Sequence, residues 1–282
     1  MRRSFIAFVW LLLMAGPAAS GQPALSLTGN ARQGNPLFLA VANLPAGTGG
    51  VVRWANHRFP LAEAGPDGVA RTVLPVPVDM PTGKRPMVIE LSDGHSIERN
   101  VPIQGRWFPT QHIGLPPETL AGYDTPQNKA DDQAILDALK PMDPERRWRG
   151  NFSVPVEAPQ TGEFGVKRLY NGWRKGWHKG IDLAGWEGQP VKAPAYGVVL
   201  HTARGVVNGN TVVLGHGLGV GSVYLHLSSI EVEDGQTVEK GEVIGRVGGT
   251  GGFGPHLHWE VRVHGEPVEP GSLYAIPRDW RR

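Results

Sequence analysis

The stretch GPHLHWEVRV, residues 254–263, places two histidines one residue apart directly after a glycine-rich run. Read with the period of two that a β-strand has, its apolar residues fall on one face, and both His256 and His258 fall on the other. The pattern predicts a half-buried strand whose two imidazoles can address one metal ion or one substrate. Glu260 and Arg262 continue the same face, where a salt bridge or solvation explains them. A solvated face that carries histidine by chance is the alternative, because short metal-like patterns recur without function.

A second candidate segment, WHKGIDL at residues 177–183, places His178 and Asp182 four residues apart. Gly180 disfavours a helix here, and in an extended chain the even spacing puts both side chains on one face. An imidazole and a carboxylate are ligand types that a metal ion accepts. The segment therefore predicts a second contribution to the same site.

A third segment, SVYLHLSS at residues 222–229, repeats this arrangement. Its apolar positions alternate with other residues, so Ser222, Tyr224 and His226 are expected to share the polar face. A single histidine is more often a surface or hydrogen-bonded residue than a ligand. Four histidines and one aspartate in three such segments nevertheless favour one shared site.

Composition narrows both the chemistry and the partners. The chain has no cysteine, which excludes disulfides, thiolate metal sites and a cysteine nucleophile, and leaves histidine and carboxylate as metal ligands. Once Arg2 and Arg3 are set aside, the basic residues no longer outnumber the 26 acidic ones. No nucleic-acid partner is therefore expected from the charge balance.

The first 20 residues have the layout of a secretory signal peptide. Arg2 and Arg3 precede an apolar run over residues 5–14, and small residues follow at positions 18–20. The run is shorter than the roughly 20 apolar residues that span a bilayer, and no later segment is long and apolar enough. We therefore expect cleavage near Ser20, a periplasmic or secreted protein and no stable membrane anchor.

The remaining chain is expected to be mainly β and to divide into three parts. Residues 21–104 alternate short apolar runs with Asn, Gly and Pro, which predicts a small β-sandwich, with an immunoglobulin-like arrangement as one candidate. Residues 105–147 form a connector that starts proline-rich and then has the apolar spacing of one helix, Lys129 to Leu139. Residues 148–282 are rich in glycine and again β.

Two patterns inside the C-terminal part suggest other functions. Residues 187–199, EGQPVKAPAYGVV, echo residues 233–247, EDGQTVEKGEVIGRV, as the hairpins of lipoyl and biotinyl carrier domains do. Carrier domains present a lysine at a tight turn between two such halves, whereas the intervening segment here is long and carries histidines. Residues 249–254 fit G-x-G-x-x-G, but they precede a strand instead of opening a helix, so a dinucleotide site is not expected.

The three histidine segments together, in this order, resemble the lysostaphin/LytM-type zinc metallopeptidases that cut peptidoglycan. The resemblance extends to FGVKRLYNG before the first ligand pair, to GNTVVLGHG at residues 209–217 and to VEKGEVIGRVGGTG before the last strand. It covers about residues 155–274 and leaves the sandwich and the connector outside. It implies a C-terminal metallopeptidase domain built as a glycine-rich antiparallel β-sheet groove of the duplicated-hybrid type.

The resemblance also implies roles for the site residues. His178, Asp182 and His258 would bind one zinc ion per chain. His226 and His256 would lie beside it as the catalytic groups, one as general base and one as a stabiliser of charge. Which of the two is the base stays open on the sequence alone.

Three further positions are weaker candidates for contacts to substrate or to a metal ligand. Tyr224 is a candidate for orienting substrate, with an ordinary strand tyrosine as the alternative. His216 lies in an LGHG motif that resembles the family, but it is better explained by a structural hydrogen bond or by a hydrogen bond to a metal ligand. Asn210 stands beside a glycine and is better explained as a turn residue.

The expected function is that of an exported zinc metalloendopeptidase that hydrolyses the peptide cross-links of peptidoglycan through a zinc-activated water. The alternative is a non-catalytic module of the same fold that binds the wall or activates a separate amidase. Modules of that kind usually lack one or more ligands, and all five positions are present here. Peptidoglycan stem peptides are the expected partner. The sandwich is a candidate for binding the wall, for spacing the enzyme from an envelope partner such as a regulator, or for covering the groove.

Overall fold

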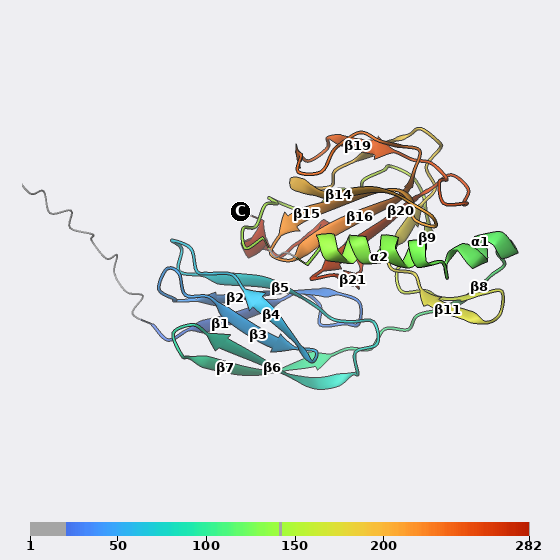
Figure 1. The fold of residues 1–282 in the computed structure, drawn as a ribbon. Helices are drawn as coiled ribbons and strands as arrows, with labels where there is room; N and C mark the ends of the chain where they lie inside the picture. Colours follow the sequence, from blue (N-terminus) through green and yellow to red (C-terminus); the bar gives the residue numbers. More distant parts are fainter. Residues whose placement is uncertain (1–20, 141–142, 282) are drawn as a thin grey trace, which may run out of the picture.

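The computed structural model describes residues 21–140 and 143–281, so the predicted signal peptide lies outside the described residues. Within these ranges the chain is mainly β, as the sequence predicts, and its sheets are mostly antiparallel (Figure 1). None of the helices in the described ranges is both long and apolar enough to cross a membrane.

The N-terminal part is a sandwich of two antiparallel sheets. Its strands are β1 (Ala24–Thr28), β2 (Pro36–Ala42), β3 (Gly50–Trp54), β4 (His57–Leu61), β5 (Ala70–Pro75), β6 (Gly83–Leu91) and β7 (Ser96–Ile103). One sheet has the order β1-β2-β5 and the other has the order β4-β3-β6-β7. Side chains from both sheets, among them Leu39, Trp54 and Ile89, are buried in one apolar cluster. The order is immunoglobulin-like, except that the fourth strand pairs with β3 instead of joining the first sheet.

The connector contains two helices where the sequence predicted one. After strand β8 (Thr110–Ile113), the chain forms α1 (Pro117–Gly122) and then α2 (Pro126–Ala138). Each helix has proline in its first turn, where the missing N–H leaves no hydrogen bond unmade. Helix α2 begins before the predicted start at Lys129 because Thr125 caps it, with its Oγ1 accepting an amide hydrogen bond of 3.1 Å from the first turn.

The C-terminal part is built around one eight-stranded sheet. Its strands, in spatial order, are β18 (Thr237–Val238), β14 (Gly197–Gly205), β15 (Gly209–Gly217), β16 (Val220–Leu227), β20 (Leu257–Val263), β12 (Ile181–Leu183) and β9 (Gln160–Gly162), with β21 (Glu266–Val268) paired to β20. A smaller sheet consists of β13 (Pro190–Lys192), β19 (Val243–Arg246) and β17 (Ser229–Ile230). Another consists of β8, β10 (Lys167–Tyr170) and β11 (Arg174–Trp177). The 3-10 turns are η1 (Pro270–Ala275) and η2 (Arg278–Trp280).

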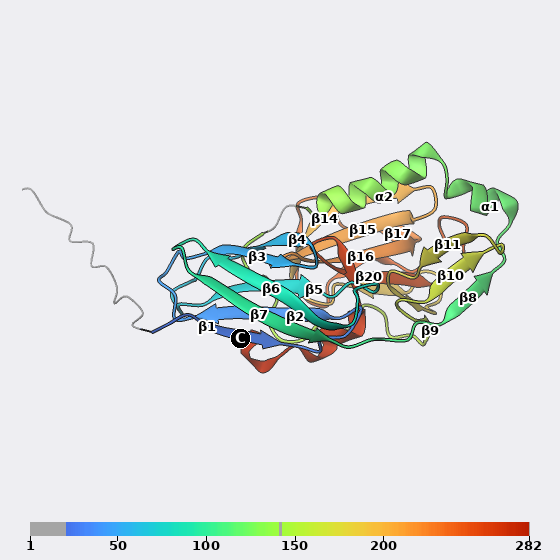
Figure 2. The ribbon, with the colours of Figure 1, turned by 90° about the horizontal axis from the view of Figure 1, so that it is seen from below.

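The large sheet is packed on both faces, which limits where its polar side chains can point. On one face, Trp259 and the alternate residues of β20 are fully buried in the main core. On the other face, Ile135 and Leu139 at the end of α2 pack against β15 and β16. Figures 1 and 2 show α2 lying across this face. Because Leu225 of β16 packs with α2 and is the cross-strand neighbour of His258, the histidine face of β20 is the face that α2 partly covers.

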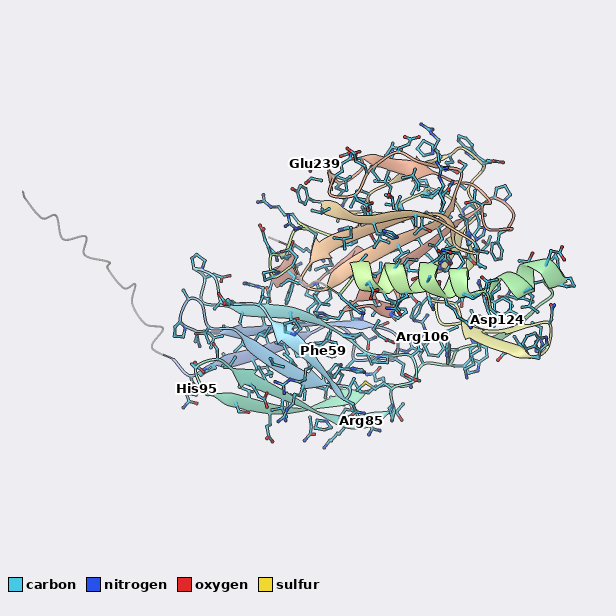
Figure 3. The ribbon with its side chains drawn as sticks, in the orientation of Figure 1. Phe59, Arg85, His95, Arg106, Asp124 and Glu239 are labelled. Carbon is cyan, nitrogen blue, oxygen red and sulfur yellow. The ribbon has the colours of Figure 1, made fainter. Side chains whose placement is uncertain are left out.

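The sandwich and the C-terminal part share a packed interface. The ring centroids of Phe38 on β2 and Trp280 on η2 are 5.2 Å apart, and both residues belong to the main core. In the turn after β20, Nε2 of His264 lies 3.0 Å from the carbonyl oxygen of Val73. The His264 ring also packs on Phe59 of β4, with centroids 5.0 Å apart; Figure 3 labels Phe59 on the sandwich. The two parts are therefore held together by side-chain packing as well as by the connector.

Candidate functional site

Three ligand-type side chains converge where β12 lies beside β20. Asp182 and His258 are direct partners across these two antiparallel strands, and His178 lies just before β12. Oδ1 of Asp182 is 2.9 Å from Nε2 of His178 and 2.8 Å from Nδ1 of His258, and the two ring nitrogens are 3.0 Å apart. All the potential ligand atoms lie within 4.8 Å of one another. The structure thus brings together the three residues that were predicted as metal ligands.

The outer nitrogen of each imidazole is anchored, which decides the tautomer. Nδ1 of His178 lies 2.6 Å from the carbonyl oxygen of Glu163 and donates to it. Nε2 of His258 lies 3.1 Å from Oε1 of Glu260 and donates to that carboxylate. With a metal ion bound in place of the protons that these rings share with Asp182, Nε2 of His178 and Nδ1 of His258 would direct lone pairs at the same point as the carboxylate. Two imidazoles and one carboxylate arranged in this way are a donor set that fits a divalent metal ion.

The carboxyl group of Asp182 is held ionised and in place. Burial alone raises its pKa, but hydrogen bonds from His178 and His258 outweigh burial and hold the pKa well below its usual range. Nη2 of Arg168 on β10 donates to Oδ2 of Asp182 at 2.8 Å. Gly162 on β9 leaves the space that the carboxylate fills, because a Cβ at that position would collide with Oδ2. Arg168 and Gly162 therefore position Asp182.

Glu260 and Arg168 are contacts of the site that the sequence analysis missed. A salt bridge or solvation was expected for Glu260, and it does form an ion pair of 2.6 Å with Arg262, but it is only 4% exposed and also accepts from His258, which was not expected. The same alternation places His258 and Glu260 on one face of the strand, and this could have indicated that Glu260 contacts the site. Arg168 and Gly162 lie on strands without histidine, and although FGVKRLYNG, which contains Arg168, was part of the resemblance, nothing in that segment indicated a contact with Asp182.

His226 and His256 flank the three-residue cluster without belonging to it. Their ring centroids are 4.8 Å apart, and the His226 centroid is 6.2 Å from that of His258. Nδ1 of His226 lies 3.0 Å from the carbonyl oxygen of Thr250, and Nδ1 of His256 lies 2.7 Å from that of Gly254. With Nδ1 donating to these carbonyls, Nε2 of each ring is left as a proton acceptor.

The two flanking rings differ in their surroundings. Burial and the imidazoles of His258 and His256 lower the pKa of His226 to about 3, so that ring is neutral at neutral pH. The ring of Phe253 packs on His226, with centroids 4.7 Å apart. The side chain of His256 is 20% exposed, and its Nε2 lies 3.9 Å from Oδ1 of Asp182. His226 is therefore the enclosed member of the pair and His256 the accessible one.

His226 reaches the site through a β-bulge that strict alternation does not predict. The register between β15 and β16 shifts so that Thr211 faces both Leu225 and His226. His226 itself has a φ of 66°, a left-handed backbone conformation that is strained for a residue other than glycine. The extra residue of the bulge places His226 in the cleft beside Leu225, where regular alternation would have put them on opposite faces.

The structure contradicts the prediction that Ser222, Tyr224 and His226 share the site face. Tyr224 is fully buried in the main core, and its hydroxyl oxygen lies 2.8 Å from Oγ of Ser222. Burial raises the pKa of Tyr224 above its ordinary value. The proposed substrate contact of Tyr224 is therefore wrong, because its side chain is not accessible from the cleft.

His216 and Asn210 make structural hydrogen bonds between strands. Nδ1 of His216 donates to the carbonyl oxygen of Tyr196 at 2.9 Å, and its Nε2 lies 2.8 Å from Oγ of Ser222. Nδ2 of Asn210 donates to the carbonyl oxygen of Leu227 at 2.9 Å. These contacts fix the strands that carry the site, and neither side chain lines the cleft beside the ligand cluster.

The buried ring of His216 predicts a loss of stability in acid. Burial lowers its pKa to about 4 from the ordinary 6.5. The unfolded chain then binds a proton more readily than the native state, so the stabilising contribution is complete above about pH 6.5 and is lost as the pH falls toward 4. Over this range we expect metal-free wild type to lose about 3 kcal/mol more unfolding free energy than His216→Gln. Urea unfolding at a series of pH values measures this difference.

The exposed His112 offers a matched control for that measurement. His112→Gln should follow the pH dependence of wild type, since this side chain lies at the surface. Equal pH dependence in wild type and His216→Gln would contradict the assignment of His216 as a buried neutral imidazole.

The site opens into a cleft of about 610 Å³. Its lining on the sheet side includes the five predicted residues His178, Asp182, His226, His256 and His258. Its lining on the connector side includes Ile113, Leu115, Tyr123, Asn128 and Asp132. The connector, which the sequence analysis left outside the metallopeptidase domain, is therefore one wall of the cleft.

Comparisons with known proteins point to the same part of the chain. The family model described as peptidase family M23 matches residues 176–270. The DD-carboxypeptidase/endopeptidase Mpg of Neisseria meningitidis serogroup B is 47% identical over 134 residues, which are 46% of this chain and 30% of that protein. The peptidoglycan DD-endopeptidase ShyA of Vibrio cholerae serotype O1 is 47% identical over 92 residues, which are 32% of this chain and 21% of that protein. The matched segments thus span less than a third of the length of these relatives.

A solved structure supports the fold beyond the matched segment. A Pseudomonas aeruginosa protein assigned to peptidase M23 superposes with a TM-score of 0.66 at 24% identity and covers 87% of this chain and 96% of its own. At this identity the likeness shows the fold, including a counterpart to most of the sandwich and the connector. The resemblance seen in the histidine segments is thus confirmed over residues 176–270, which match the model of peptidase family M23.

Proposed function

We propose that this protein is an exported zinc metalloendopeptidase that hydrolyses the peptide cross-links of peptidoglycan. The observation that carries the proposal is the convergence of His178, Asp182 and His258 within 4.8 Å in an open cleft, with both imidazoles anchored from behind. His226 and His256 stand beside them with free Nε2 atoms. The M23 domain and the relatives named as DD-endopeptidases support hydrolysis of peptidoglycan.

Zinc is the metal that fits this donor set best. Catalytic zinc sites combine three nitrogen or oxygen ligands with an open position, and two histidines with one carboxylate are a common set. Nε2 of His178, Oδ1 of Asp182 and Nδ1 of His258 would hold one ion per chain. Zinc bound there supplies a water whose pKa is lowered toward about 7 and polarises the substrate carbonyl.

His226 and His256 handle the proton and the developing charge in this proposal. Each ring donates from Nδ1 to a backbone carbonyl, so each Nε2 can accept a proton. The resulting imidazolium can return that proton to the leaving amine or donate to the oxyanion of the attacked carbonyl. Because both rings have this arrangement, we assign the two roles to the pair. Separate substitution of His226 and His256 distinguishes the general base from the residue that stabilises charge.

The direct cross-link between D-amino acids is the proposed bond. Two relatives are named as DD-peptidases, whereas a glycine bridge has no such support among them. Export through the predicted signal peptide, residues 1–20, would deliver the enzyme to the periplasm or beyond, where peptidoglycan lies.

The proposed domain division is a sandwich over residues 21–104, a connector over residues 105–147 and a metallopeptidase domain over residues 148–282. The sandwich has an apolar cluster of its own, which supports this division, while its residues Phe38, Ala62 and Val73 pack into the main core of the C-terminal part. The sandwich is the proposed contact for an envelope regulator, since it lies outside the matched family segment.

A non-catalytic module that activates a separate amidase is the second candidate function. Such a module needs the M23 fold but needs neither a complete donor set nor bases with free acceptor atoms. Here the three ligand-type groups and both flanking histidines are present and line one cleft, which favours the enzyme.

The test is digestion of isolated cell-wall sacculi by purified residues 21–282, with and without a chelator. We expect cross-linked muropeptide dimers to disappear, chelator to stop this and added zinc to restore it, because the donor set is complete. Mass spectrometry of the new termini identifies the peptide bond that is cleaved. Unchanged sacculi after incubation with zinc-loaded protein would contradict the enzyme, and faster release of stem peptides by an added amidase would then support the module.

A further inference from the structure

Two exposed tryptophans lie beside the candidate site and have no part in the proposed chemistry. Trp107, between β7 and β8, is 81% exposed, and Trp177, at the end of β11, is 39% exposed. A single exposed apolar residue needs no explanation, whereas a continuous exposed apolar surface commonly marks a place that a partner covers. Trp177 directly precedes His178 and lines the main cleft, so this surface is continuous with the site.

A row of cavities leads from the main cleft to Trp107. The second cavity has a volume of about 350 Å³ and the third about 440 Å³. Trp177 lines all three cavities, and Trp107 lines the third. Lys167 is the cross-strand partner of both Trp177 and Thr110, so the row crosses β11, β10 and β8 in that order. With neighbouring strands about 4.8 Å apart, this crossing is about 10 Å wide.

Of the two tryptophans, Trp177 is held from behind by packing and charge. The Phe108 ring meets the Trp177 ring edge-on, with centroids 5.6 Å apart. Arg106, between the sandwich and the C-terminal part in Figure 3, lies 5.3 Å from the Phe108 centroid and forms an ion pair of 2.8 Å with Glu269. Nζ of Lys167 lies 5.4 Å from the centroid of Trp177. A surface that is ordered in advance loses little side-chain freedom when a ligand binds.

We propose that Trp107 and Trp177 bind the saccharide chain of peptidoglycan beside the peptide that the site cleaves, a proposal that rests on the function proposed above. A sugar ring has an apolar face that can stack on an aromatic ring, and hydroxyl groups that need hydrogen-bond partners. Asp79, Arg106 and Lys167 line the cavity with the two tryptophans and supply such partners. Their mixed charges suit a polar ligand without a strong charge of its own.

The covalent structure of the substrate places a sugar within reach of this surface. Each stem peptide is attached to the glycan through its N-terminus, and four extended residues span at most about 14 Å. The strands between Trp177 and Thr110 cover a similar distance, about 10 Å. A stem peptide held in the main cleft can therefore lay its sugar on the row of cavities.

The test compares two soluble substrates on the full chain, residues 21–282. One is a cross-linked stem-peptide dimer without sugar, and the other is the same dimer carrying its disaccharides. For Trp107→Ala we expect the KM of the sugar-bearing dimer to rise about tenfold, as for the loss of one aromatic contact. The kinetics of the sugar-free dimer should stay within about twofold of wild type, because Trp107 does not line the main cleft.

Trp186→Ala is the matched control, because Trp186 is 65% exposed but lies outside the three cavities. It should leave the kinetics of both substrates unchanged. An equal loss on both dimers in Trp107→Ala would overturn the proposal, because it would show an effect on the peptide site. Unchanged kinetics in Trp107→Ala, or the same loss in Trp186→Ala, would also overturn it.

A binding measurement separates this proposal from the proposed function. Glycan strands stripped of peptide are titrated into the metal-free full chain and followed by calorimetry. We expect saturable binding that Trp107→Ala weakens about tenfold and Trp186→Ala leaves unchanged. Such binding by a chain that cleaves neither dimer would reject the peptidase and support the saccharide surface. Cleavage without this binding would reject the surface and support the peptidase.

Discussion

Replacing His258 by alanine is expected to abolish tight zinc binding and peptidase activity together. Nδ1 of His258 lies 2.8 Å from Oδ1 of Asp182 and 3.0 Å from Nε2 of His178, so its removal leaves two of the three donors. Loss of a hydrogen bond behind a ligand costs about 10- to 100-fold in metal affinity, and loss of the ligand itself should cost more. Activity on sacculi should fall to that of chelator-treated wild type.

The measurement for His258→Ala is zinc content after dialysis, together with the rate of sacculus digestion. Thermal unfolding of the metal-free variant and metal-free wild type checks the fold, since Glu260 keeps its ion pair with Arg262 when His258 is removed. His112→Ala, at the exposed surface of β8, is the control and should retain both zinc and activity. A His258→Ala protein with one tightly held zinc per chain would contradict the ligand assignment.

Replacing His226 is expected to leave zinc bound and to remove turnover. The His226 ring stands 6.2 Å, between centroids, from that of His258 and outside the three-residue cluster, so zinc content should remain one per chain. Loss of a positioned acid–base group lowers kcat by about 10²- to 10⁴-fold. His226→Ala should therefore lower kcat within that range, with KM changed much less.

The backbone of His226 calls for a second variant at the same position. Its φ of 66° is strained for alanine, whereas asparagine adopts this conformation more readily. His226→Asn should thus keep the bulge and show the same loss of turnover. His256→Ala, measured in parallel, divides the roles of the two rings, because the ring that acts as base carries the larger loss of kcat. Loss of zinc from the folded His226→Asn protein would show that His226 is a ligand instead.

Much of the site could be predicted from the sequence because it depends on local periodicity. The alternation in residues 257–263 fixes the face of His258, and the four-residue spacing of His178 and Asp182 suits an extended chain. The structure keeps the first pattern, although β20 is buried on both faces instead of one, whereas Gly180 forms a bend between His178 and Asp182. Strand pairing then sets Asp182 directly opposite His258. The resemblance between these segments and the LytM/lysostaphin type supplied the order of the motifs.

Other features could not be predicted, because they depend on segments far apart in the sequence. Alternation on β16 fails at His226, where a register shift opposite Thr211 and a left-handed backbone place the ring in the cleft and leave Tyr224 in the core. The cap at Thr125 and the proline-led first turns made two helices of the connector, where hydrophobic spacing indicated one. Arg168 donates a hydrogen bond to Asp182, and Gly162 leaves room for its carboxylate. Both residues lie on strands whose sequence pattern does not indicate a contact with the site.

By itself, the sequence determined the mainly β fold, the three histidine segments and the donor types, because each follows from residue identity and from periodicity within one strand. The tertiary structure alone decided which strands are neighbours, where the bulge lies and which residues stand behind the ligands. It also made the connector a wall of the cleft and set Trp107 and Trp177 on one row of cavities. The reason is physical: strand register, packing and burial are set by contacts between distant segments, and spacing within one segment does not encode them.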